Sequence, residues 1–130
     1  MRAMGMFQVR VKVTNPADPG RSFEEPFWVD SGALYSFVPE DRLAVIGLQP
    51  LKTREVILAD GRHERRLFGE AQLTVEGLDE TLTCPLVFGP PGSLFLLGAT
   101  ALEAFGVNVD PITRRLQPVA AVIGGFLASR

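Results

Sequence analysis

The chain has 130 residues, which is enough for one domain with a sizeable hydrophobic core and leaves little room for a second domain. Its formal net charge is −2 and its hydrophobic fraction is 46%, values that argue against a nucleic-acid partner and against intrinsic disorder. Cys84 is the only cysteine and lies in an apolar segment, so we expect a buried thiol rather than a disulfide. The longest apolar stretch, residues 119–128, is too short for a membrane-spanning helix, and residues 1–13 lack the apolar region of a signal peptide. We therefore expect a soluble, cytoplasmic protein with no membrane partner.

Alternating apolar and polar side chains predict many short strands, and two other segments predict short helices. In chain order we expect strands over residues 7–13, 22–29 and 33–38, a helix from residue 39 that Gly47 ends, strands over 55–58, 67–75, 81–88 and 94–97, a helix over 99–105, and strands over 107–109 and 116–119. Pro26 should interrupt the second strand, and Asp60-Gly61 is typical of a two-residue type I′ hairpin turn. The apolar run 94–97 should be fully buried. Short strands with frequent turns indicate an all-β barrel or sandwich.

Several kinds of catalytic or binding site are disfavoured by what the sequence lacks. A metal site needs clustered His, Cys or carboxylate side chains, whereas His63 and Cys84 are single examples of their types. A Ser/His/Asp arrangement would have to use His63, which lies two residues past a predicted hairpin tip and is poorly placed for an oriented base. The sequence contains no glycine-rich phosphate-binding loop. We expect neither a metal nor a cofactor.

The segment around Asp30 differs from the other acidic positions. An apolar strand that ends in Phe27-Trp28-Val29 delivers the Asp30 carboxylate into a tight turn, followed at once by Ser31 and Gly32. A buried aspartate is costly unless it is hydrogen-bonded, and the hydroxyl and open backbone that follow could supply such bonds. The alternative is a structural Asp-x-Gly turn in which Asp30 bonds its own backbone.

Three features taken together resemble one protein family. They are Asp30-Ser31-Gly32-Ala33 after a predicted hairpin, a glycine-bearing hairpin tip at Asp60-Gly61, and Leu96-Leu97-Gly98 followed by a helix. This set is similar to that of the retropepsin-like aspartic proteases, and more narrowly to the bacterial and archaeal single-domain type. The resemblance spans residues 7–119. It implies a closed, retropepsin-like β-barrel with one or two short helices, one domain over residues 1–130, and a homodimer.

The resemblance also implies roles for individual residues. Asp30 aligns with the catalytic aspartate, and its supporting residues would be Ser31, whose hydroxyl would bond across the dimer, Gly32 and Ala33. The substrate-binding residues would lie in the flap that closes over substrate, at Ala59, Asp60, Gly61 and Arg62. The flap tip carries a single glycine, whereas viral members are glycine-rich, and residues 40–53 form a helical insertion relative to the compact viral form.

The chemistry of this family explains why one copy of the chain would be incomplete. Two carboxylates act on one water: one removes its proton and the other protonates the carbonyl oxygen of the peptide bond. The chain has a single Asp-Ser-Gly, so a twofold axis would have to bring Asp30 of each subunit together. At about 4 Å and an effective dielectric near 20, two carboxylates repel by about 4 kcal/mol, so the pair would share one proton. The implied activity is that of an aspartic endopeptidase acting on peptides or proteins.

Two other interpretations stay open. The domain could be a non-catalytic relative of the same fold that serves in dimerisation or peptide binding, because fold does not fix function. It could also be an unrelated β-barrel that binds a small ligand. The apolar tail, residues 119–130, would add to the dimer interface or else cover its own barrel.

Overall fold

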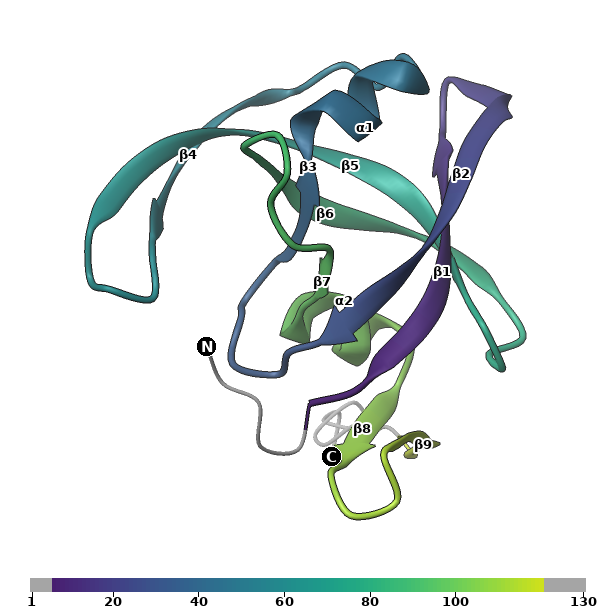
Figure 1. Cartoon of the computed structure of the whole chain (residues 1–130). Coiled ribbons are helices and arrows are strands. Elements are labelled where there is room, and N and C mark those ends of the chain that lie inside the picture. Colours follow the sequence, from purple (N-terminus) through teal and green to yellow (C-terminus); the bar gives the residue numbers. More distant parts are fainter. Residues whose placement is uncertain (1–5, 121–130) are drawn as a thin grey trace, which may run out of the picture.

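The computed structural model describes residues 6–120, which form nine strands and two short helices (Figure 1). In chain order the elements are β1 (Gln8–Asn15), β2 (Asp18–Val29), β3 (Ser36–Pro39), α1 (Glu40–Val45), β4 (Lys52–Ile57), β5 (His63–Val75), β6 (Thr81–Gly89), β7 (Leu96–Leu97), α2 (Ala99–Ala104), β8 (Val107–Asp110) and β9 (Arg115–Pro118). The predicted tail beyond residue 120 lies outside the described residues, so its place in an interface stays a prediction. No described helix has the length and apolar character needed to cross a membrane.

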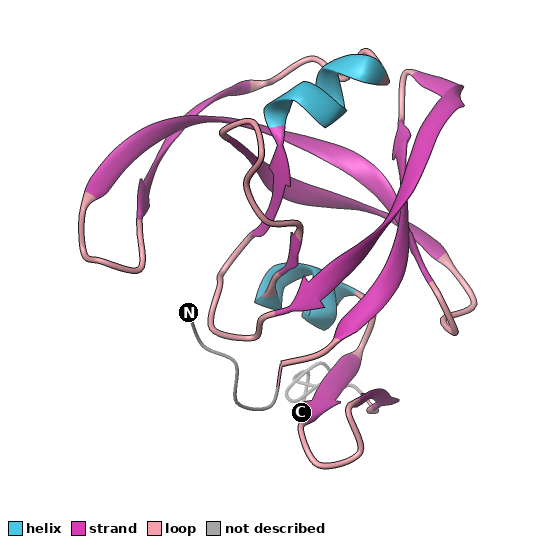
Figure 2. Ribbon diagram, in the orientation of Figure 1, coloured by secondary structure: helices cyan, strands magenta, loops and turns pink. Residues whose placement is uncertain are grey.

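Seven strands form one sheet in the order β1-β2-β7-β3-β6-β5-β4, and β1 also pairs with β5. Most pairings are antiparallel, but β7 runs parallel to β2, and β3 runs parallel to β6. Strands β8 and β9 form a separate hairpin. Figure 2 shows that strands dominate the chain, with α1 directly after β3 and α2 in the lower half of the view, where it contacts β3, β6 and β8. The sequence predicted an all-β fold with one or two short helices, and the described residues are mostly strand with two short helices.

The core is built from the apolar side of each alternating strand. Side chains that point to the same side of a strand recur every second residue, which places one face of each strand in the interior. Fully buried side chains come from β1, β2, β3, β5, β6 and β7, and α1 adds its one buried residue; they include Val11, Val13, Phe27, Val38, Leu43, Leu73, Leu86 and Leu97. Cys84 is also fully buried, and burial raises the pKa of its thiol to about 11.

Three details of the predicted strands were wrong. Strand β2 is not interrupted at Pro26, which pairs opposite Arg10. At that point β2 is an edge, since β7 pairs only with its last two residues, and an edge accommodates a residue without an N–H. The strand predicted over residues 33–38 is only Ser36–Pro39, and the run 94–97 is a strand only at Leu96–Leu97, with Leu94 47% exposed.

The hairpin tip also has a different turn from the predicted type I′. A type I′ turn needs positive φ at both central residues, but among the tip residues only Gly61 has one, at 87°. The Gly61 N–H donates to the Leu58 carbonyl at 2.9 Å, and the Leu58 N–H donates to the Arg62 carbonyl at 2.8 Å. The turn therefore spans residues 58–61 and closes with Gly61 in the left-handed conformation, which glycine adopts without steric cost.

Candidate active site

Asp30 lies directly after β2, where the strand reaches the interior. The side chains of Phe27 and Val29 are buried, and Asp30 itself is only 6% exposed. Its N–H donates to the Leu97 carbonyl at 3.0 Å, which continues the parallel pairing of β2 with β7. Its carboxylate Oδ1 accepts the Gly32 N–H at 3.0 Å. A structural turn makes this last bond too, so the feature that singles out Asp30 is a carboxylate buried at a strand end, where desolvation is costly.

The turn that carries Asp30 is fixed by α2, more than sixty residues further along the chain. The Ala33 N–H donates to the Asp30 carbonyl at 3.1 Å, which closes the turn. The carbonyl of Ala33 then accepts the Ala99 N–H at 2.7 Å, and that of Leu34 accepts the Thr100 N–H at 2.9 Å. The Thr100 hydroxyl donates to the same Leu34 carbonyl at 2.7 Å. Residues 31–35 thus form a loop whose backbone bonds to the start of α2, which explains why they do not extend β3.

Gly98 lies where these two segments cross, and no larger residue fits there. A Cβ at Gly98 would lie 2.5 Å from both the carbonyl carbon and oxygen of Tyr35 and 2.9 Å from the Ala33 oxygen. The Gly98 N–H donates to the buried hydroxyl of Ser36 at 3.0 Å. The structure therefore brings the predicted Asp30-Ser31-Gly32-Ala33 segment against the predicted Leu96-Leu97-Gly98 segment. Ser36 was not predicted, because nothing in the sequence pairs it with Gly98.

Ser31 and Gly32 are exposed, and Ala33 is half-buried. Ser31 borders a shallow hollow formed with α2 and β8, whose other lining residues include Leu102, Glu103 and Asn108. The hydroxyl predicted to bond across a dimer is thus at the surface of a single chain.

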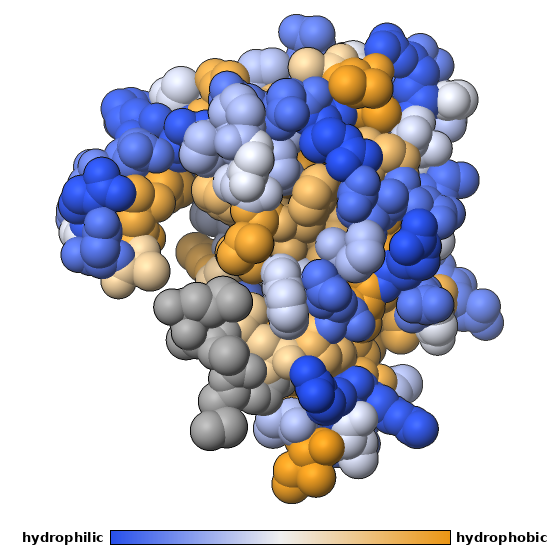
Figure 3. Space-filling model, in the orientation of Figure 1, coloured by the Kyte–Doolittle hydropathy of each residue, from blue (hydrophilic) through white to orange (hydrophobic). Residues whose placement is uncertain are grey.

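The other predicted site residues lie at the tip of the β4–β5 hairpin, which projects from the body of the molecule (Figure 1). Ala59, Asp60, Gly61 and Arg62 are all exposed. The Asp60 carboxylate accepts the Arg62 backbone N–H at 3.0 Å and its Nε–H at 2.6 Å, and these two bonds hold the pKa of Asp60 below its usual value. Figure 3 shows the hairpin overhanging a hollow, with apolar side chains on its inner side.

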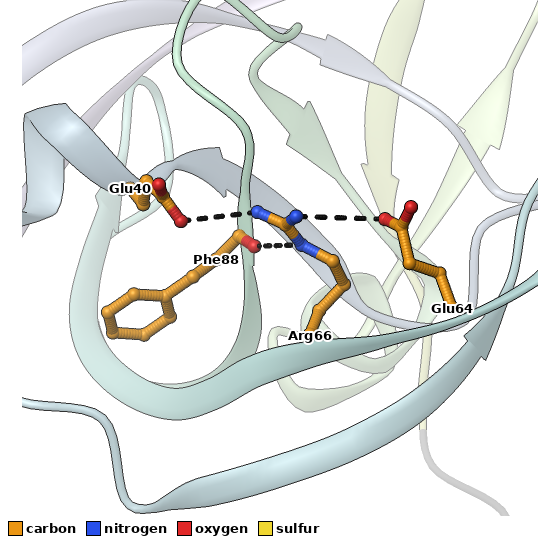
Figure 4. Close-up of polar contacts among 4 residues, drawn as sticks. All are labelled: Glu40, Glu64, Arg66 and Phe88. Atoms are coloured by element: carbon orange, nitrogen blue, oxygen red, sulfur yellow. Dashed lines mark hydrogen bonds and ion pairs between the residues drawn. The ribbon is translucent and has the colours of Figure 1, made fainter.

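The inner face of this hairpin carries two arginines that sequence reasoning missed. Arg54 of β4 and Arg66 of β5 are directly opposite each other in the pairing register. Arg66 donates to the Phe88 carbonyl at 2.9 Å and lies 3.2 Å from Glu40 and 3.7 Å from Glu64 (Figure 4). The two-residue periodicity of the strands could have identified them, since Arg54 and Arg66 alternate with the exposed residues of β4 and β5.

Arg54 bonds to the segment that carries Asp30. Its Nη1 donates to the Tyr35 hydroxyl at 2.6 Å, and its guanidinium lies 4.2 Å from the centre of the Phe68 ring. The Tyr35 and Phe68 rings meet edge to face with centroids 4.9 Å apart. The base of the hairpin is therefore anchored to the loop after Asp30. Among the described residues, no three His, Cys, Asp or Glu side chains gather into a group that could hold a metal ion.

The sequence matches no protein-family model and no curated protein. Solved structures do match. The simian foamy virus (mac) protease superposes with a TM-score of 0.52 at 16% identity, over 75% of this chain and 92% of the protease. A retropepsin-like aspartic protease from Rickettsia conorii superposes with a TM-score of 0.54 at 17% identity, over 89% of this chain and 94% of that protein.

The fold is retropepsin-like. A foamy viral protease–reverse transcriptase, solved in complex with an RNA/DNA hybrid, also matches with a TM-score of 0.53 at 12% identity, over 89% of this chain but only 13% of that longer one. At these identities the likeness establishes the fold of the chain, and the activity has to be argued from the residues themselves.

Proposed function

We propose that this chain is an aspartic endopeptidase in which two copies each contribute Asp30 to one site. The observation that carries the proposal is the position of Asp30 in a retropepsin-like fold. It is buried at the end of β2, bonded through its N–H to β7 and supported by the bonds from Ala33 and Leu34 to α2. A scaffold without catalytic function has little reason to hold a carboxylate in such a costly place.

The homodimer follows from the chemistry of peptide hydrolysis. One carboxylate must accept a proton from the attacking water while another donates one to the carbonyl oxygen, and each subunit offers a single Asp-Ser-Gly. In a twofold dimer the hydroxyl of the exposed Ser31 of one subunit would form a hydrogen bond to the other subunit, beside the hollow between α2 and β8. We also propose that the pairing of β1 with both β2 and β5 closes the sheet into a barrel.

The β4–β5 hairpin is proposed as the flap that covers a bound peptide. It projects over the hollow seen in Figure 3, and its tip residues Ala59, Asp60, Gly61 and Arg62 are all exposed, with Asp60 accepting two bonds from Arg62. A hairpin supported only at its base can move as a unit, which is the behaviour required of a lid that admits and releases substrate. Gly32 and Ala33 would approach the peptide backbone from the opposite side.

Cleavage of a random peptide library at mildly acidic pH tests this function. Wild type should cut peptides internally, and Asp30→Asn should be inactive while still folded. Asp79→Asn, which alters an exposed aspartate, should behave as wild type. Peptide binding without any cleavage by wild type would favour the non-catalytic, peptide-binding interpretation instead.

A further inference from the structure

The two arginines on the inner face of the hairpin have unequal electrostatic environments. Arg66 lies within ion-pair distance of both Glu40 and Glu64 and is bonded to a carbonyl as well, so its charge is compensated (Figure 4). Arg54 faces it across the strand pair, and within residues 6–120 no carboxylate lies within ion-pair distance of it. A half-buried cation without a counter-ion is unfavourable, so a bound anion here would be stabilised.

The hydrogen-bond donors of Arg54 and Tyr35 also favour an acceptor group supplied by a ligand. A guanidinium has five N–H donors, and the Tyr35 hydroxyl accepts one of those on Arg54. Because the Tyr35 oxygen accepts that bond, its own O–H remains to be donated. Phe68 packs against both groups and fixes their orientation. The cluster thus presents N–H and O–H donors from one rigid platform, which suits a carboxylate.

The cluster is close enough to Asp30 to contact the same bound peptide. Tyr35 is five residues beyond Asp30, and a chain extends at most about 3.6 Å per residue, so the Cα atoms of the two residues lie within about 18 Å of each other. An extended peptide covers that length in about five residues. Strand β4 lies on the hairpin that overhangs the hollow, so Arg54 approaches the peptide from the flap side.

We propose that Arg54, oriented by Tyr35 and Phe68, binds the side-chain carboxylate of an acidic residue in the peptide substrate. The enzyme would then prefer Glu or Asp at one position within about five residues of the scissile bond. This inference rests on the proposed endopeptidase function, because it concerns the substrate of that site.

Matched peptides test the proposal. A positional library first identifies the preferred acidic position, and two peptides that differ only as Glu or Gln at that position are then compared. Wild type should show a kcat/KM at least about tenfold higher for the Glu peptide, and added salt should reduce the ratio. Arg54→Gln should abolish the preference, Tyr35→Phe should weaken it, and Arg54→Glu should transfer it to a Lys peptide.

Arg65→Gln is the matched control, because Arg65 lies on the exposed outer face of the same hairpin and bonds only to Thr53 among the described residues. Cleavage with no acidic preference at any position, or a preference that survives Arg54→Gln, would overturn the inference and leave the peptidase function standing. If no peptide is cut, the proposed function fails, and binding of the labelled library to Asp30→Asn decides the inference separately. Tighter binding of acidic peptides that is lost in Asp30→Asn/Arg54→Gln would support the site, and equal or absent binding would overturn it.

Discussion

Replacing Gly98 with alanine should damage both the fold and the candidate site, because one added methyl would clash with backbone. The Cβ would lie 2.5 Å from the Tyr35 carbonyl carbon and oxygen, and backbone cannot move aside as a flexible side chain can. Gly98 has φ −96° and ψ 177°, a conformation that any residue adopts, so the expected effect is steric and does not come from backbone strain.

The size of the effect follows from what the methyl would displace. Overpacking costs about 1–3 kcal/mol. Separating the two segments would also weaken the bonds from Ala99 to Ala33 and from Thr100 to Leu34, each contributing about 1 kcal/mol. A combined loss of roughly 3–5 kcal/mol is a large part of the 5–15 kcal/mol that typically stabilises a domain. With a urea slope of about 2 kcal/mol per M, the unfolding midpoint should fall by roughly 1.5–2.5 M.

Fluorescence of Trp28, the only tryptophan, reports on this transition, because Trp28 pairs with Leu96 beside the crossing. Gly20→Ala is the control, since a Cβ there meets nothing closer than the Asp18 carboxylate oxygen at 3.8 Å. Both variants should be measured at the same protein concentration, because dimerisation contributes to apparent stability. Equal midpoints for Gly98→Ala and wild type, with activity retained, would refute the claim that this crossing holds Asp30 in place.

Three further predictions concern the flap, the tuning of the site and the core. Amide hydrogens of residues 55–67 should exchange faster than those of residues 94–105, and a peptidomimetic inhibitor should slow them; equal protection without ligand would contradict the flap assignment. Ala33→Ser adds a hydroxyl that can donate to the Asp30 carboxylate and stabilise its charged form, so the pH profile of kcat/KM on an uncharged peptide should move to lower pH, by up to about one unit, and not upward. Burial raises the pKa of Cys84 to about 11, so the native thiol should resist a thiol reagent at pH 8 and react only in urea. At the lower end of the range from pH 9 to pH 11 only the thiol of the unfolded chain ionises, which lowers the free energy of unfolding of wild type. The variant Cys84→Ala, which has no thiol, should therefore lose less stability than wild type over that range.

Local sequence patterns were enough to predict most strands, because burial of one strand face leaves a period of two. The alternation in residues 7–13 and 67–75 became β1 and β5, and Gly47 and Gly106 end the two helices with φ of 71° and 67°. The predicted hairpin at residues 107–119 was confirmed as β8 and β9. The Asp30 turn was also predicted, since a polar group directly after an apolar strand is a local signal.

Features that depend on distant partners could not be predicted. Residues 33–35 look like strand, but their carbonyls bond to α2, and the sequence does not show that partner. Leu94 is apolar and yet exposed, because strand pairing begins only at Leu96. The bond from Arg54 to Tyr35 joins two segments 19 residues apart and depends on how the hairpin folds back. Such contacts arise from tertiary structure and leave no periodic pattern in one sequence.

Mixing subunits tests the central claim most directly, namely that each site takes one Asp30 from each of two chains. A fixed amount of wild type is unfolded and refolded together with a ninefold excess of Asp30→Asn, and peptide cleavage is measured per wild-type chain. If both carboxylates are needed, random pairing leaves only wild-type dimers active, and activity per wild-type chain should fall to about one-tenth of that of wild type refolded alone. Activity per wild-type chain that does not change with the excess of Asp30→Asn would mean that a single chain carries a complete site, and would contradict the account.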